Sequence, residues 1–160
     1  MVILVMGVSG SGKTTIGQML SAQLNWPFVD GDSLHSAANV AKMAAGIPLT
    51  DEDRAPWLQS IHDVMEGWLI QQKNGIVASS ALKEKYRRIL LTSPEIKIVY
   101  LRGSYELIYS RMQHRPGHYM KPEMLQSQFA ALEEPADAIV IDIAAPAEEI
   151  VANIRQKLAI

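Results

Sequence analysis

The sequence predicts an α/β domain with a parallel sheet. Three observations predict it. Short apolar runs recur along the chain, amphipathic stretches of helical spacing separate them, and a glycine-rich turn joins the first run to the first amphipathic stretch. Buried parallel strands read as continuous aliphatic runs, and each needs a crossover, usually a helix, before the next strand. We therefore expect strand and helix units wound around one sheet.

Five apolar runs are predicted as strands, because each is mostly aliphatic and is followed by a polar or glycine turn. They span residues 2–6, 27–29, 76–79, 96–101 and 138–141. Six segments are predicted as helices: 13–24, 53–72, 83–91, 105–111, 122–132 and 147–158. Residues 30–57 and 113–122 carry polar, glycine and proline signals, which predicts irregular, functional loops.

Composition limits the classes of function. The chain has 160 residues, 48% of them hydrophobic, which fits a single domain over residues 1–160. Its net charge of -2 argues against a nucleic-acid partner. The lack of cysteine excludes disulfides, thiolate catalysis and cysteine-based zinc sites. The apolar start is too short for a signal sequence or a membrane span, so we expect a cytoplasmic protein with no membrane partner.

The glycine-rich turn is the most specific motif. Residues 7–14 read GVSGSGKT and fit G-x-x-x-x-G-K-[ST], a P-loop, between a predicted strand and a predicted helix. Such a loop points backbone N–H groups at phosphate oxygens. Lys13 is expected to reach the β and γ phosphates, and Thr14 to ligate Mg²⁺. The predicted nucleotide-binding residues of this segment are Gly7, Ser9, Gly10, Ser11, Gly12, Lys13, Thr14 and Thr15.

Other motifs narrow the kind of P-loop protein. A GTPase would need D-x-x-G and N-K-x-D, and neither occurs in the chain. Its small size and early P-loop favour a small-molecule or nucleotide kinase. A nucleotide-binding regulatory protein without turnover is a rival of a different class.

An acid pair follows the second predicted strand. Asp30 and Asp32 flank Gly31 at the sheet edge where ligands of open α/β sheets bind. Alternation along an extended segment would point both carboxylates toward the phosphates. We expect Asp30 to hold the water shell of Mg²⁺ and Asp32 to accept a hydrogen bond from a substrate hydroxyl and to help as a base. An ordinary Asp-Gly turn is the alternative.

Five segments resemble the gluconate kinase (gluconokinase) family: DGDSLH, KMAAGIPLTDEDRAPWL, SSALKEKYRRIL, YLRGSYELIYSRMQHRPGHYM and LQSQFAALEEP. The resemblance runs from Gly7 to about Pro135. It implies a nucleotide-kinase-like three-layer sandwich with a five-stranded parallel sheet ordered 2-3-1-4-5 and a lid at about residues 112–127. It also implies phosphorylation of D-gluconate at its 6-hydroxyl by ATP with Mg²⁺, usually in a homodimer.

Gluconate carries a carboxylate and several hydroxyls, so its site needs cations and hydrogen-bonding groups. Arg54 can pair bidentately with the carboxylate, although a solvated arginine balancing its acidic neighbours is an equal alternative. Lys83 follows the third strand, and a surface lysine is its alternative. His35 and His118 match family motifs and are expected to bind substrate. Gln128 is a candidate hydroxyl ligand.

Two arginines fall in the expected lid. Arg111 and Arg115 are four residues apart, and lid arginines stabilise charge on a transferring phosphoryl group. Arg115 is assigned to the phosphates, as a catalytic residue with Lys13 and Asp32. Arg111 is assigned to the adenine or phosphate side, with a helix-end charge as its alternative. Pro146, in the loop after the last strand, is expected to border adenine.

Two positions depart from the family pattern. Ser36 replaces its usual proline, which could loosen the loop after His35, and Ser79 replaces its usual cysteine at a position expected to be buried. Shikimate kinase is the nearest rival, but it would want G-G-G where this chain reads SSALK. A nucleoside monophosphate kinase is a second rival.

Overall fold

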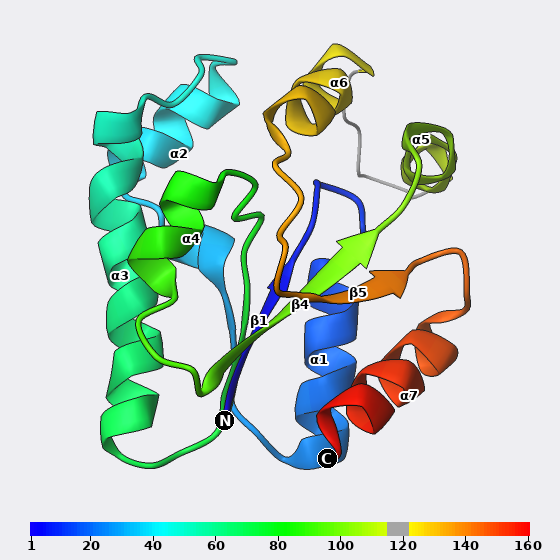
Figure 1. Ribbon diagram of the computed structural model, residues 1–160. Coiled ribbons are helices and arrows are strands. Elements are labelled where there is room, and N and C mark those ends of the chain that lie inside the picture. Colours follow the sequence, from blue (N-terminus) through cyan, green and yellow to red (C-terminus); the bar gives the residue numbers. More distant parts are fainter. Residues whose placement is uncertain (115–121) are drawn as a thin grey trace.

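The sheet in the computed structural model has five strands, and the model describes residues 1–114 and 122–160. All pairings are parallel, in the order β2-β3-β1-β4-β5. The strands are β1 (Val2–Met6), β2 (Phe28–Asp30), β3 (Gly75–Ala78), β4 (Ile96–Arg102) and β5 (Ile139–Asp142). The predicted fold class and strand order are confirmed (Figure 1).

Helices cover both faces of the sheet, which explains the unbroken apolar run of β1. On one face lie α1 (Lys13–Leu24) and α7 (Ala147–Leu158), and on the other lie α3 (Asp51–Ile70) and α4 (Glu84–Leu90) (Figure 1). Ile3 and Val5 pack with α1 and α7, whereas Leu4 packs with α3, because successive side chains of a strand alternate. All five residues of β1 are therefore buried.

The other helices lie beyond the carboxyl ends of the strands (Figure 1). They are the 3₁₀ helix η1 (Gly31–Leu34), α2 (Ala37–Ala44), α5 (Tyr105–Gln113) and α6 (Pro122–Ala131). Both chain termini lie at the opposite end of the sheet. No helix in the described ranges is long and apolar enough to cross a membrane.

The prediction of an irregular stretch over residues 30–57 was wrong. This segment contains η1, α2 and the start of α3. The helix α3 begins at Asp51, two residues before the predicted start. Thr50 and Asp53 form a capping box at that start. The Oγ of Ser36 accepts a hydrogen bond from the backbone N–H of Asn39 at 3.1 Å, so Ser36 caps α2 instead of loosening the loop.

Candidate active site

The P-loop joins β1 to α1 as a tight turn. The backbone N–H of Ser11 donates to the carbonyl of Val8 at 3.1 Å. Gly10 has a φ of +83°, which glycine adopts without a steric cost, and a Cβ there would lie 2.6 Å from the sulfur of Met112 in α5. The predicted nucleotide-binding residues from Gly7 to Thr15 thus occupy this turn and the first turn of α1.

Lys13 lies between the P-loop carbonyls and the acid pair. Its Nζ donates to the carbonyls of Gly7 at 3.0 Å and Val8 at 3.1 Å. Burial lowers its pKa from 10.5 to about 8, and the charges of Asp32 and Asp30 oppose that shift. The structure therefore brings together the lysine and both carboxylates that the sequence singled out.

Asp30 links the end of β2 to the P-loop helix. One carboxylate oxygen accepts from the Oγ1 of Thr14 at 3.1 Å, and the other accepts from the backbone N–H of Asp32 at 3.0 Å. A hydroxyl and a carboxylate oxygen at this spacing suit a hard divalent cation. The chain then turns into η1, so the extended geometry expected for this segment was wrong beyond Asp30. Asp32 is exposed at this turn.

The turn between the two acids packs tightly on the sheet. A Cβ at Gly31 would lie 2.7 Å from the carbonyl oxygen of Ala78 in β3, so only glycine fits without a shift. The indole N–H of Trp57 in α3 donates to the carbonyl of Gly31 at 2.7 Å. Trp57 is itself buried. Its N–H also holds the turn between Asp30 and Asp32, called the acid turn below, and the sequence did not indicate this contact.

His35 is held in place from two sides. Its ring stacks on Trp57 with centroids 4.2 Å apart, and its Nδ1 lies 3.2 Å from the Nδ2 of Asn39. The same Nδ2 donates to the carbonyl of Asp53, so it is the amide nitrogen, and the imidazole Nδ1 must accept. The proton of neutral His35 therefore sits on Nε2. Burial lowers the pKa of His35, while Asp32 opposes and Arg54 adds to the shift.

Arg54 lies near the start of α3 and contacts α4. Its Nη1 donates to the carbonyl of Leu49 at 2.9 Å and to the hydroxyl of Tyr86 at 3.2 Å, and it lies 3.9 Å from Asp51. The pairing with an acidic neighbour matches the alternative weighed for Arg54. Lys83 follows β3 directly before α4 and is half-buried. Tyr86 is a site neighbour that the sequence did not indicate.

Gln128 of α6 contacts the P-loop. Its Oε1 accepts from the backbone N–H of Ser9 at 3.2 Å and lies 3.4 Å from the hydroxyl of the same residue. In this structure it lies against the nucleotide loop. Arg111 is exposed in the last turn of α5, and Pro146 is exposed just before α7. Arg115 and His118 lie outside the described residues.

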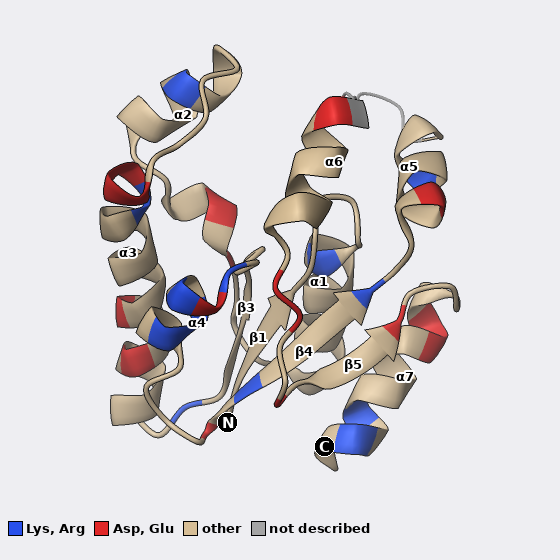
Figure 2. Ribbon diagram, turned by 45° about the horizontal axis from the view of Figure 1, so that its top comes forward, with Lys and Arg blue, Asp and Glu red and all other residues tan. Residues whose placement is uncertain are grey.

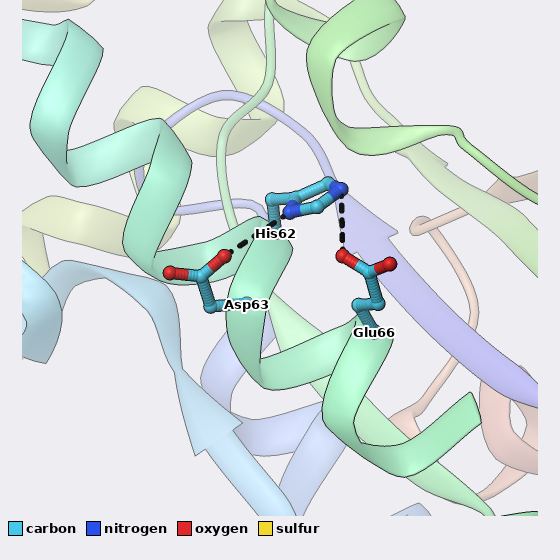
Figure 3. Close-up of side chains that lie close together, drawn as sticks. All are labelled: His62, Asp63 and Glu66. Carbon is cyan, nitrogen blue, oxygen red and sulfur yellow. Dashed lines mark hydrogen bonds and ion pairs between the residues drawn. The ribbon is translucent and has the colours of Figure 1, made fainter. Parts of the chain in front are cut away.

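A second group of polar side chains lies on α3. The Nδ1 of His62 is 3.3 Å from Asp63, and its Nε2 is 3.3 Å from Glu66 (Figure 3). All three residues belong to one helix, and both carboxylates are exposed. These contacts lie along the surface of one helix, and we assign them no part in the site.

Comparisons with known proteins agree with this geometry. A family model described as shikimate kinase matches residues 9–159. The chain is 48% identical over 145 residues to the thermosensitive gluconokinase of Escherichia coli strain K12, covering 88% of this chain and 78% of the relative. It is 44% identical over 136 residues to a gluconokinase of Gluconobacter oxydans strain 621H, covering 84% and 76%.

Solved structures of a gluconokinase and of a shikimate kinase differ in their similarity to this chain. A gluconokinase from Sinorhizobium meliloti 1021 matches with a TM-score of 0.86 and 39% identity, covering 99% of this chain and 95% of that one. A shikimate kinase from Aquifex aeolicus matches with a TM-score of 0.61 and 22% identity, which shows a shared fold only. The family model indicates a P-loop kinase, and the named relatives at 44–48% identity are gluconokinases. The chain belongs to the gluconokinase family of P-loop kinases.

Proposed function

We propose that this protein transfers the γ-phosphoryl group of ATP to the 6-hydroxyl of D-gluconate, giving 6-phosphogluconate and ADP. The observation that carries the transfer is the convergence of Lys13, Asp30 and Asp32 beside the P-loop. The choice of acceptor is supported by the identity to named gluconokinases. The resemblance also implies a homodimer, which a solution mass near twice 17.7 kDa would support.

The donor half of the site holds the triphosphate. Backbone N–H groups of the P-loop and the Lys13 ammonium bind phosphate oxygens. Thr14 and Asp30 would hold Mg²⁺, which neutralises phosphate charge when it is bound. Arg111 and Arg115 act on the nucleotide and its phosphates from the lid, and Pro146 borders adenine. Charge neutralisation and positioning supply most of the rate in such a reaction.

The acceptor half holds and orients gluconate. Asp32 accepts the proton of the reacting hydroxyl, and the Nε2–H of His35 donates to a neighbouring oxygen. Arg54 and Lys83 attract the carboxylate, and His118 and Gln128 contribute further hydrogen bonds. The Nε2–H groups of Gln128 would donate to a hydroxyl of gluconate while its Oε1 keeps the contact with Ser9.

Release of ADP tests the acceptor directly. With ATP and Mg²⁺, we expect gluconate to stimulate ADP release, and shikimate, other aldonates and nucleoside monophosphates to do so far less. Stimulation by another acceptor and none by gluconate would contradict the proposed substrate and leave the kinase fold intact. No ADP release with any of these acceptors would favour a nucleotide-binding regulatory protein without turnover.

Asp32→Asn tests the assignment of the acid pair. We expect kcat to fall by about a hundredfold or more, the range typical of general acid–base groups, with the Kd for ATP nearly unchanged. Asp63→Asn, an exposed acid of α3, is the matched control and should behave like the wild type. Equal losses in kcat and ATP affinity would reassign Asp32 to structure or metal binding.

A further inference from the structure

A buried arginine of α4 joins two segments at the carboxyl edge of the sheet. Arg87 is 4% exposed. Its Nη1 donates to the carbonyls of Ala81 at 2.8 Å and Leu82 at 3.0 Å, and its Nη2 donates to the carbonyl of Glu133 at 2.7 Å. One guanidinium thus holds three backbone carbonyls, two from the loop before α4 and one from a residue 46 positions after Arg87. The proposed transfer uses none of these contacts.

The first segment is the loop between β3 and α4, which carries Lys83. Ala81 in this loop has a φ of +43° and is 2% exposed. A left-handed conformation is unfavourable for a residue with a Cβ, so other contacts must hold the loop in this shape. The two carbonyls on Nη1 belong to this residue and the next one. The position of Lys83 therefore depends on the contact with Arg87.

The second segment directly follows α6. Glu133 receives the Nη2 bond, donates its backbone N–H to the carbonyl of Leu82 at 2.8 Å, and accepts from the N–H of Glu84 at 3.2 Å. Figure 2 shows the chain between α6 and β5 running beside the loop that leads into α4. Because Gln128 of α6 contacts Ser9, this one helix connects the nucleotide loop to the acceptor loop.

Arginine is suited to this position by its shape. Its planar fork presents several N–H donors in fixed directions, so it can satisfy three carbonyls at once, whereas lysine offers a compact point charge. An apolar side chain would fill the same volume but take away the donor to the buried carbonyl of Ala81. Burial lowers the pKa of Arg87, and the carboxylates of Glu133 and Glu84 oppose this shift.

We infer that Arg87 is a positioning residue. It bonds the loop that carries Lys83 to the segment directly after α6, and so fixes this loop relative to α6, the helix that contacts the P-loop. The inference rests on the proposed function for the identity of the acceptor. It leads to a specific kinetic expectation, since loss of the tie should misplace the acceptor more than the nucleotide.

Kinetics of Arg87→Met and Arg87→Lys test this role. In Arg87→Met, we expect the KM for gluconate to rise at least about tenfold, which corresponds to one lost charge-assisted hydrogen bond, with the KM for ATP within about twofold. Arg87→Lys should recover part of the loss. Arg88→Met is the matched control, because Arg88 is the next residue of α4, is exposed and contacts Glu84. It should match the wild type.

Equal changes in both KM values, or no change in a folded Arg87→Met, would overturn the role. If Arg87→Met does not fold, Glu133→Ala removes the contact with the Glu84 N–H and should raise the KM for gluconate in the same direction. An unchanged KM in that variant would count against the inference.

Hydrogen exchange separates this inference from the proposed function. In Arg87→Lys without ligands, the amides of residues 79–83 and 132–134 should lose protection together. Loss in one segment alone would contradict the tie, whichever acceptor the enzyme uses. If the wild type does not phosphorylate gluconate, the proposed function fails, while this result still decides the role of Arg87.

Discussion

Two opposing effects, burial and nearby carboxylates, set the pKa of Lys13. Burial disfavours its charge and wins over the attraction of Asp32 and Asp30, so its pKa falls to about 8. Between about pH 8 and 10.5 the unfolded chain binds more protons at this side chain than the folded one. The contribution of Lys13 to the free energy of unfolding therefore rises with pH across this window. Below about pH 8 the side chain is charged in the folded protein, and burying that charge is unfavourable.

Nucleotide binding should reverse the shift at Lys13. The phosphate charges favour the ammonium, so MgATP binding at pH 8 should take up a fraction of a proton, up to about half. Calorimetry in two buffers of different ionisation enthalpy measures this uptake. Lys13→Met should abolish it. The same uptake in wild type and variant would mean that another group titrates.

Ser79 is a position where a substitution should stabilise the protein. In the described part of the chain, its buried hydroxyl has no hydrogen-bond partner. Because a buried unpaired polar group is destabilising, Ser79→Ala should raise the free energy of unfolding by about 1 kcal/mol without changing turnover. Thermal unfolding checks this, with half-buried Ser80→Ala as the control. A lower Tm for Ser79→Ala would show that the hydroxyl is satisfied in solution.

How far residues could be predicted from sequence depended on their separation along the chain. The P-loop residues were predicted as site residues because their partners are local and the motif is contiguous. Asp30 and Asp32 were predicted because they follow a strand at the ligand-binding edge. The stack of His35 on Trp57 and the contact of Arg87 with Glu133 were not predicted, since they join residues far apart in sequence.

Among the elements, burial decided what the sequence could predict. The strands were recognised because both faces of the sheet are covered, which leaves unbroken apolar runs. The helix α2 was missed because it has only eight residues and its larger apolar side chains, Val40 and Met43, are exposed, so it buries no apolar stripe. Its one clear signal was the cap at Ser36, which had been interpreted as a departure from the family pattern.

Ser36 therefore offers a prediction about α2. Ser36→Ala should lower the free energy of unfolding by about 1 kcal/mol, because it removes the cap on Asn39. Ser36→Pro should lie closer to the wild type, since a φ of -64° suits proline and the extended His35 suits the residue before it. Chemical denaturation measures all three proteins. A proline variant less stable than the alanine variant would contradict this geometry.

For the whole molecule, the strand order brings distant segments to one edge. The P-loop after β1, the acid turn after β2 and the Lys83 loop after β3 come from neighbouring strands. Parallel connections place all three at the same end of the sheet. The sequence predicted these segments one by one, but the strand order that brings them together came from the family resemblance, because strand periodicity carries no information on neighbours.

This arrangement predicts that the two ligands stabilise the protein cooperatively. The helix α6 contacts both the P-loop and the segment bonded to the Lys83 loop, so a ligand in either half orders a helix that the other half shares. MgADP and gluconate together should raise Tm by more than the sum of their separate shifts. Lys13→Met should lose the nucleotide shift and keep that of gluconate. Strictly additive shifts in the wild type would mean that the two halves bind independently.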